Sequence, residues 1–176
     1  MTEQSIERLY ALAARARTVN GRADDDPWRC AVYLSANSWY DDGIDGADRL
    51  AAQSAACKAK LRRLRTVKKA ATYRERNTGV KTDVEFRKLQ ADIENRRIDC
   101  VMVADLSGLP YCYAYAANYL REVIFPCGFR FIDVALDFDS LHGNPKDYLR
   151  ALDHRNRSFW RYYHDALRAE NEVSHG

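Results

Sequence analysis

Residues 98–105 read Ile-Asp-Cys-Val-Met-Val-Ala-Asp, and the loop after them reads Leu-Ser-Gly-Leu-Pro-Tyr. The run from Ile98 to Val103 is short, apolar and rich in β-branched residues, which favours a strand buried on both faces. Asp105 and Ser107 follow its carboxyl end directly. Because ligands gather at that edge of an open parallel sheet, the stretch predicts the central strand of an α/β domain with a site nearby.

Similar apolar runs and helical patterns alternate on both sides of this strand. The other predicted strands are Trp28–Leu34, Ala70–Tyr73 and Phe129–Val134, and the predicted helices between the strands are Asp45–Arg65, Asp83–Arg96 and Tyr113–Phe125. This order predicts a three-layer α/β/α domain of Rossmann-like architecture. Its sheet is expected to be mostly parallel, with four to five strands and helices on both faces.

Two more helices are expected outside this core. Thr2–Val19 has apolar residues at helical spacing and is followed by a polar, acidic linker. Lys146–Glu172 is rich in charged and aromatic residues and contains no Gly or Pro. We therefore expect an N-terminal helix with its linker at 1–27, a core domain at 28–144 and a C-terminal helix at 145–176.

The composition of the 176 residues is that of an ordinary globular domain, with a formal net charge of +3. Such a mild charge permits a nucleic-acid partner without requiring one. No apolar run approaches membrane-spanning length, and the N-terminus lacks the apolar segment of a secretory signal. We expect a cytoplasmic protein with no membrane partner.

The five cysteines are an odd number, are widely spaced and include no C-x-x-C pair, which argues against a zinc site or a disulfide framework. Cys30 and Cys100 fall in predicted strands, where buried small side chains are expected. The four histidines show no ligand spacing, and no glycine-rich phosphate loop is present. The sequence therefore indicates no metal, no cofactor and no small-molecule ligand.

A run of basic residues follows the middle of the predicted helix 45–65. Cations near a helix C-terminus stabilise its dipole, and most charge runs are simply solvated, so this is the favoured interpretation. The alternative is contact with DNA phosphates. The residues concerned are Lys58, Lys60, Arg62, Arg63, Arg65, Lys68 and Lys69.

The pattern resembles the catalytic domain of serine recombinases, a family of resolvases, invertases and large serine integrases. The resemblance is most specific in Phe86–Ser107 and continues through Tyr119–Ile132 and, for the large-integrase branch, Asp137–Asn144. Upstream, Ala31–Ser38, Arg49–Cys57 and Tyr73–Gly79 resemble the first strand, the Gln-containing helix and the second strand with its turn. The resemblance implies a resolvase-like fold and a role in site-specific DNA recombination.

In that family a serine hydroxyl attacks a DNA phosphodiester, and arginines stabilise the negative charge of the transition state. The family's first-strand motif is Tyr-x-Arg-x-Ser. Counted from Tyr33, the arginine position falls on Ser35 and the serine position on Asn37, while Ser38 lies one residue late. The nucleophile and the first arginine are thus both replaced.

The second motif, Asp-Leu-Ser-Arg-Leu-x-Arg, appears as Asp105-Leu-Ser-Gly-Leu-Pro-Tyr, so both arginines have become Gly108 and Tyr111. A further family arginine aligns with Asp83. Gln53 and Asp105 remain at matching positions. Since each transition-state donor contributes roughly a factor of 100–1,000 in rate, these losses together predict negligible strand cleavage.

The leading hypothesis is therefore a recombinase-like domain without strand cleavage, acting as a binding or regulatory module. Its expected partners are DNA, a second copy of the chain or an active recombinase. One alternative is an active enzyme with Ser38, or else Ser35, as a displaced nucleophile, assisted by Gln53, Asp105 and arginines of the basic run. Another is a protein-interaction module that uses the aromatic residues Phe159, Trp160, Tyr162 and Tyr163.

Overall fold

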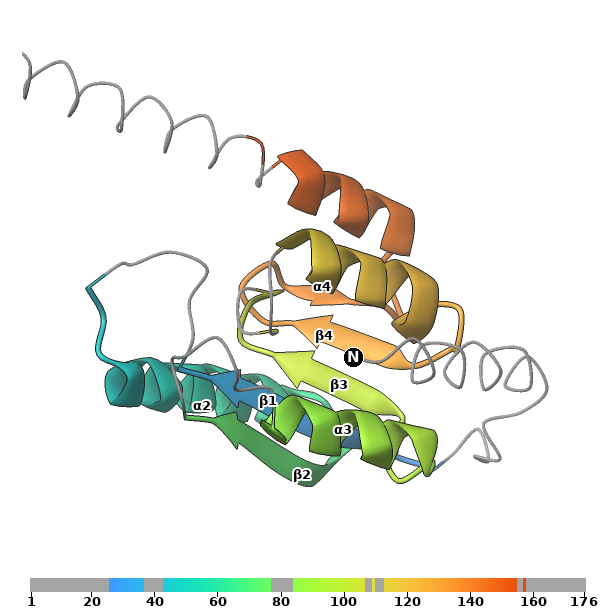
Figure 1. The fold of residues 1–176 in the computed structure, drawn as a ribbon. Coiled ribbons are helices and arrows are strands. Elements are labelled where there is room, and N and C mark those ends of the chain that lie inside the picture. Colours follow the sequence, from blue (N-terminus) through green and yellow to red (C-terminus); the bar gives the residue numbers. More distant parts are fainter. Residues whose placement is uncertain are drawn as a thin grey trace, which may run out of the picture. The chain divides into compact units, whose positions relative to one another are not determined.

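A five-stranded sheet forms the centre of the structure, a computed structural model that describes residues 26–36, 43–76, 84–106, 109, 113–154 and 157. The strand order is β2-β1-β3-β4-β5 (Figure 1). The first four strands are parallel, and the short β5 runs antiparallel to β4. The strands are β1 (Trp28–Ser35), β2 (Val67–Glu75), β3 (Cys100–Val103), β4 (Arg130–Asp133) and β5 (Phe138–Asp139).

The helices lie between the parallel strands in the expected order. α2 (Gly46–Arg63) begins after Asp45, whose carboxylate accepts a hydrogen bond from the Ala47 amide at 2.7 Å. α3 (Val84–Glu94) follows β2, and α4 (Tyr113–Tyr119) continues into a π-helical turn, η2 (Leu120–Ile124). A turn over residues 125–128 follows the helical stretch and ends at Gly128, which has a left-handed φ of 70°.

Alternate residues of the strands face opposite layers of helices. Val32, Met102 and Ile132 belong to one apolar cluster together with Cys57 and partly buried leucines of α2. On the other face, the ring of Tyr33 contacts Phe86 of α3, which in turn contacts Tyr119 of α4. Because strand side chains alternate with a period of two, α2 covers one face and α3 with α4 cover the other. The predicted three-layer α/β/α architecture is confirmed.

Two strand predictions needed correction. β2 was expected over Ala70–Tyr73 but extends over Val67–Glu75, paired with β1 from Trp28 to Ser35. Lys68 and Lys69 are exposed on this outer strand, so they lack the apolar signature of a buried strand. β5 is not among the four strands predicted by residue range, and its two residues form a strand by pairing with Ile132 and Asp133 of β4.

A buried ion pair joins β4 to β5 near the start of β4. Both Arg130 and Asp139 are almost fully buried, and Arg130 Nε donates to Asp139 Oδ1 at 2.9 Å. The same guanidinium donates to Thr66 Oγ1 at 3.1 Å and lies over the Trp28 ring. Burial by itself raises the pKa of Asp139, but the hydrogen bonds from Arg130 and from the Leu141 amide, together with the Arg130 charge, hold it below its usual value.

The N-terminal helix expected at Thr2–Val19 lies outside the described residues, as do Ser38 and the aromatic residues near position 160. Of the predicted C-terminal helix, residues 145–154 are described as helical. Asn144 caps this helix through its side chain, which accepts a hydrogen bond from the Lys146 amide at 2.9 Å. No helix in the described part of the chain has the length and apolarity needed to cross a membrane.

Candidate functional site

Three of the four predicted catalytic residues can be placed, and the fold brings them toward the carboxyl edge of the sheet. Ser35 is the last residue of β1, and Asp105 lies two residues beyond the end of β3. Gln53 is a buried residue of α2, whose N-terminus meets this edge beside Ala36. The fourth residue, Ser38, is outside the described residues.

Gln53 and Ser35 are joined by two hydrogen bonds that involve the Ser35 backbone. The Ser35 amide donates to Gln53 Oε1 at 2.9 Å, and Gln53 Nε2 donates to the Ser35 carbonyl at 3.0 Å. The β1–β3 pairing stops at Tyr33 and Val103, so Ser35 lies beyond the reach of that strand ladder. The Gln53 amide thus takes the place of the absent strand neighbour and fixes the end of β1.

Ser35 is a poor candidate for attack on a substrate in this arrangement, because the residue is only 1 % exposed. Gln53, at 9 % exposure, uses both ends of its amide on the Ser35 backbone. These two residues therefore form a structural clamp beneath the edge of the sheet. A nucleophile acting here would have to come from another residue.

Asp105 is half-buried, and the fully buried Asp133 ends the neighbouring strand β4. Asp133 accepts a hydrogen bond from the Leu136 amide at 3.1 Å, which shapes the turn after β4. Burial, followed by electrostatic interactions with Cys30, Asp133 and Asp105, raises the pKa of the Cys57 thiol to about 12. Cys57 is therefore protonated at neutral pH and is not an activated thiol nucleophile.

The structure adds two arginines that the sequence analysis did not single out. Arg74 is the penultimate residue of β2 and Arg76 follows the strand, so both lie at the same edge as Ser35. Glu75 stands between them, is 2 % exposed and accepts a hydrogen bond from the Glu85 amide at the start of α3. If β2 had been expected to continue past Tyr73, the alternation Arg-Glu-Arg would have indicated that the two arginines share one face of the strand.

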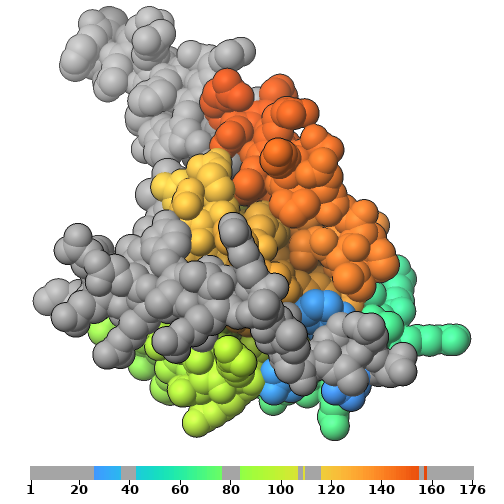
Figure 2. Space-filling model, turned by 90° about the vertical axis from the view of Figure 1, so that its right-hand side faces the viewer, coloured from blue at the N-terminus to red at the C-terminus, as the bar shows by residue number. Residues whose placement is uncertain are grey.

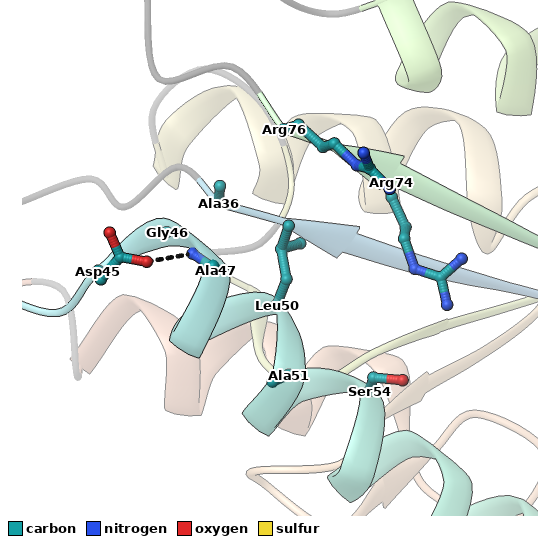
Figure 3. Close-up of a pocket in the computed structure, with 9 residues that line it drawn as sticks. All are labelled: Ala36, Asp45, Gly46, Ala47, Leu50, Ala51, Ser54, Arg74 and Arg76. Atoms are coloured by element: carbon teal, nitrogen blue, oxygen red, sulfur yellow. Dashed lines mark hydrogen bonds between the residues drawn. The ribbon is translucent and has the colours of Figure 1, made fainter.

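Arg74 and Arg76 border a pocket of about 640 Å³. Figure 3 shows the two guanidinium groups on the β2 side and residues from the first turns of α2 on the other side. The pocket is lined by Ala36, Asp45, Gly46, Ala47, Leu50, Ala51, Ser54, Arg74 and Arg76. It combines two cations, one carboxylate and one hydroxyl with a small apolar floor.

The basic run lies at the opposite end of the sheet from this pocket. α2 starts at the carboxyl edge and its 18 residues lead back to the amino edge, a length of roughly 25 Å. Figure 2 looks at that amino end, where the end of α2 and the start of β2 lie at the surface in blue-green. The structure therefore separates the predicted DNA-binding residues from the predicted catalytic residues.

Most side chains of the basic run are exposed to solvent. Lys60 is the exception, because its ammonium group forms an ion pair with Asp137 in the turn after β4. Hydrogen bonds and charge from Lys60 hold the pKa of Asp137 below its usual value. The other members are exposed on the end of α2, the following turn and the start of β2; they are Lys58, Arg62, Arg63, Arg65, Lys68 and Lys69.

Comparison with known proteins identifies the fold and nothing finer. No protein-family model matches the sequence, and no curated protein matches it. The structure is similar to the N-terminal catalytic domain of TP901-1 integrase, with a TM-score of 0.55, 18 % identity, and coverage of 77 % of this chain and 98 % of that one.

It is also similar to a resolvase family site-specific recombinase from Streptococcus pneumoniae, with a TM-score of 0.54 and 21 % identity. That match covers 77 % of this chain and 93 % of the recombinase chain. At such low identity the likeness concerns the arrangement of the backbone. The predicted resolvase-like fold is confirmed, and this chain shares it with the catalytic domain of an integrase.

Proposed function

We propose that this chain is a recombination-related DNA-binding module that has a resolvase-like fold and does not cleave DNA strands. The main observation in support of the proposal is that Ser35 is only 1 % exposed and is held through its backbone by Gln53. A serine at this edge must be accessible to attack a phosphodiester. Here it serves to fix the end of a strand.

The replacement of arginines at the positions expected from the family supports the same proposal. Four such positions carry Ser35, Asp83, Gly108 and Tyr111. Without arginines there, the developing charge of a phosphoryl-transfer transition state lacks its usual donors, each contributing roughly a factor of 100–1,000 in rate. Arg74 lies on β2 and Arg76 directly follows it, so they do not restore these positions one for one.

The exposed cations at the amino end of the sheet support DNA binding. Arg62, Arg63 and Lys68 are among six members of the basic run that form no ion pair with any residue in the described ranges. Each phosphate that they neutralise releases counterions, so binding through them must weaken steeply with salt. A module of this kind acts on recombination by occupying DNA, or by assembling with an active recombinase on it.

The test is a covalent-adduct assay with a parallel binding assay. The protein is incubated with DNA from its own locus, quenched with denaturant and run on a denaturing gel beside Ser38→Ala and Ser35→Ala variants. We expect no shifted band, together with a salt-sensitive complex in a non-denaturing gel. A shifted band that disappears in Ser38→Ala would establish an active recombinase instead, and the absence of any complex would refute DNA binding.

A further inference from the structure

We propose that Arg74 and Arg76 form an oxyanion site that binds a phosphate group, and that the DNA backbone supplies this phosphate. The identification of DNA as the source rests on the function proposed above. The site itself rests on the pocket between the end of β2 and the start of α2 (Figure 3). Both arginines lie in the stretch Tyr73–Gly79 that resembles the family's second strand and turn, but neither stands at one of the family's arginine positions described above.

Strand geometry places the two arginine side chains on the same face. Side chains two residues apart in a strand point to the same face, so Arg74 and Arg76 share the α2 side, where both line the pocket. Glu75 points to the other side, where its carboxylate caps the start of α3 by accepting from the Glu85 amide at 2.9 Å. The intervening acid therefore does not neutralise the pair.

Within the described ranges, neither Arg74 nor Arg76 forms one of the ion pairs or hydrogen bonds made by arginine side chains. Other arginines form these, for example Arg29 with Asp99 and Arg130 with Asp139. Arg74 and Arg76 are exposed at the rim of the pocket. A guanidinium group presents a planar set of donors that matches two oxygens of a phosphate, so two such groups can hold one phosphate from adjacent sides.

The remaining lining fits a phosphate attached to a larger molecule. The volume of about 640 Å³ lies in the range of small-ligand sites. Ser54 offers a hydroxyl donor, while Leu50 and Ala36 give an apolar surface on which a sugar can rest. Asp45 is the one opposing charge, and its carboxylate is engaged with the Ala47 amide at 2.7 Å. Two cations against one carboxylate leave the pocket positive.

The experiment uses pyrophosphate and a labelled DNA duplex as separate probes of the full chain. Pyrophosphate binding is measured by isothermal titration calorimetry for the wild type, for R74Q/R76Q and for R96Q/R121Q. The last variant is a matched control, because it removes the same charge from exposed arginines that belong neither to the pocket lining nor to the basic run. Thermal melting of each variant checks that it is folded.

We expect pyrophosphate affinity to fall by about tenfold or more in R74Q/R76Q, as the removal of charge-assisted hydrogen bonds implies, and to change less than about twofold in R96Q/R121Q. Asp45→Asn keeps a capping side chain and removes the opposing charge, so it should tighten pyrophosphate binding. No binding by the wild type, or an equal fall in affinity in both double variants, would overturn the site.

The duplex then identifies the source of the phosphate. Fluorescence anisotropy of the DNA complex is measured over a range of salt concentrations. If the backbone occupies the pocket, R74Q/R76Q lowers the slope of log affinity against log salt by about 0.9 for each DNA phosphate that the variant no longer neutralises. An unchanged slope, with Arg74- and Arg76-dependent pyrophosphate binding, would assign the pocket to a free phosphate compound. A wild type that binds pyrophosphate but no DNA would refute the proposed function and leave the site standing.

Discussion

The side-chain amide of Gln53 satisfies both backbone groups of Ser35, accepting from its amide at 2.9 Å and donating to its carbonyl at 3.0 Å. Both residues are buried, so water cannot replace the amide if it is removed. A glutamine on α2 therefore continues the hydrogen bonding of β1 past the point where β3 ends. This relationship ties α2 to the carboxyl edge of the sheet.

Gln53→Met keeps the length of the side chain and removes both hydrogen bonds. We expect the free energy of unfolding to fall by about 1–3 kcal/mol, because a buried amide and carbonyl lose their partners. Urea denaturation measures the change, and faster hydrogen exchange at the Ser35 amide locates it. Lys58→Met, at an exposed position of the same helix, should leave both measurements nearly unchanged. Equal effects of the two substitutions would show that the clamp does not stabilise the edge.

Gly46 allows α2 to start close to the end of β1. A Cβ added at Gly46 would lie 3.1 Å from the Ala36 Cβ, which is closer than such atoms normally approach. We expect Gly46→Ala to destabilise the wild type by about 1 kcal/mol through overpacking, and to be neutral or stabilising when combined with Ala36→Gly. A double-mutant cycle by urea denaturation measures this coupling, and additive effects would contradict the close approach.

We expect the Arg130–Asp139 pair to make part of the free energy of unfolding sensitive to acid. The pKa of Asp139 is lowered in the folded protein, so its contribution is complete above the unfolded value of 3.8 and is lost as the pH falls through the folded value. Asp139→Asn should remove this part of the pH dependence of unfolding below pH 4. The measurement is urea denaturation at a series of acidic pH values, and an unchanged pH profile would exclude Asp139 as its source.

Removing one partner of this ion pair should lower the free energy of unfolding more than replacing both partners with apolar residues. Asp139→Leu leaves the buried Arg130 charge uncompensated, for which we expect a decrease in stability of about 3–5 kcal/mol. The double variant R130M/D139L removes both charges and should regain most of that decrease, since apolar side chains can fill the same space. Thermal and urea denaturation of the two variants compare them directly. A double variant that is less stable than Asp139→Leu would contradict this account.

Thiol reactivity offers a further test of the core. Cys30, Cys57, Cys100 and Cys127 are buried, and burial raises the pKa of Cys57 to about 12 and that of Cys127 to about 11. A Cys112→Ser variant lacks the fifth cysteine and keeps these four. We expect Ellman's reagent at pH 8 to label almost no thiol of this variant in the native state and all four after addition of guanidinium chloride. Rapid labelling of the native variant would show that the core opens readily.

The core strands were predictable because consecutive apolar residues mark them in the sequence. Val101 to Val103 are apolar on both faces, and this pattern has few solutions other than a central strand. The outer strand β2 begins with Val67, Lys68 and Lys69, whose exposed side chains resemble those of any polar surface. Its full length depends on pairing with β1, which is a contact between distant segments.

The candidate site was predictable only in part, for the same reason. Gln53 and Ser35 were both identified as site residues, but the two hydrogen bonds between them join backbone to side chain across 18 positions and leave no mark in the sequence. Arg74 and Arg76 were missed because the strand was expected to end at Tyr73. The basic run was recognised, but only the direction of α2 shows that it lies far from the other site residues.

The position of β2 at the border of the sheet has a consequence for self-association. In the described part of the chain, β2 has a strand neighbour on one side only, and it is nine residues long. A border strand of that length is a template on which another chain can add a strand and start an aggregate. Lys68, Lys69 and Arg74 are exposed along it, and a second copy would bring like charges together there. The same cations that suit an acidic partner therefore also protect the sheet from growing at its border.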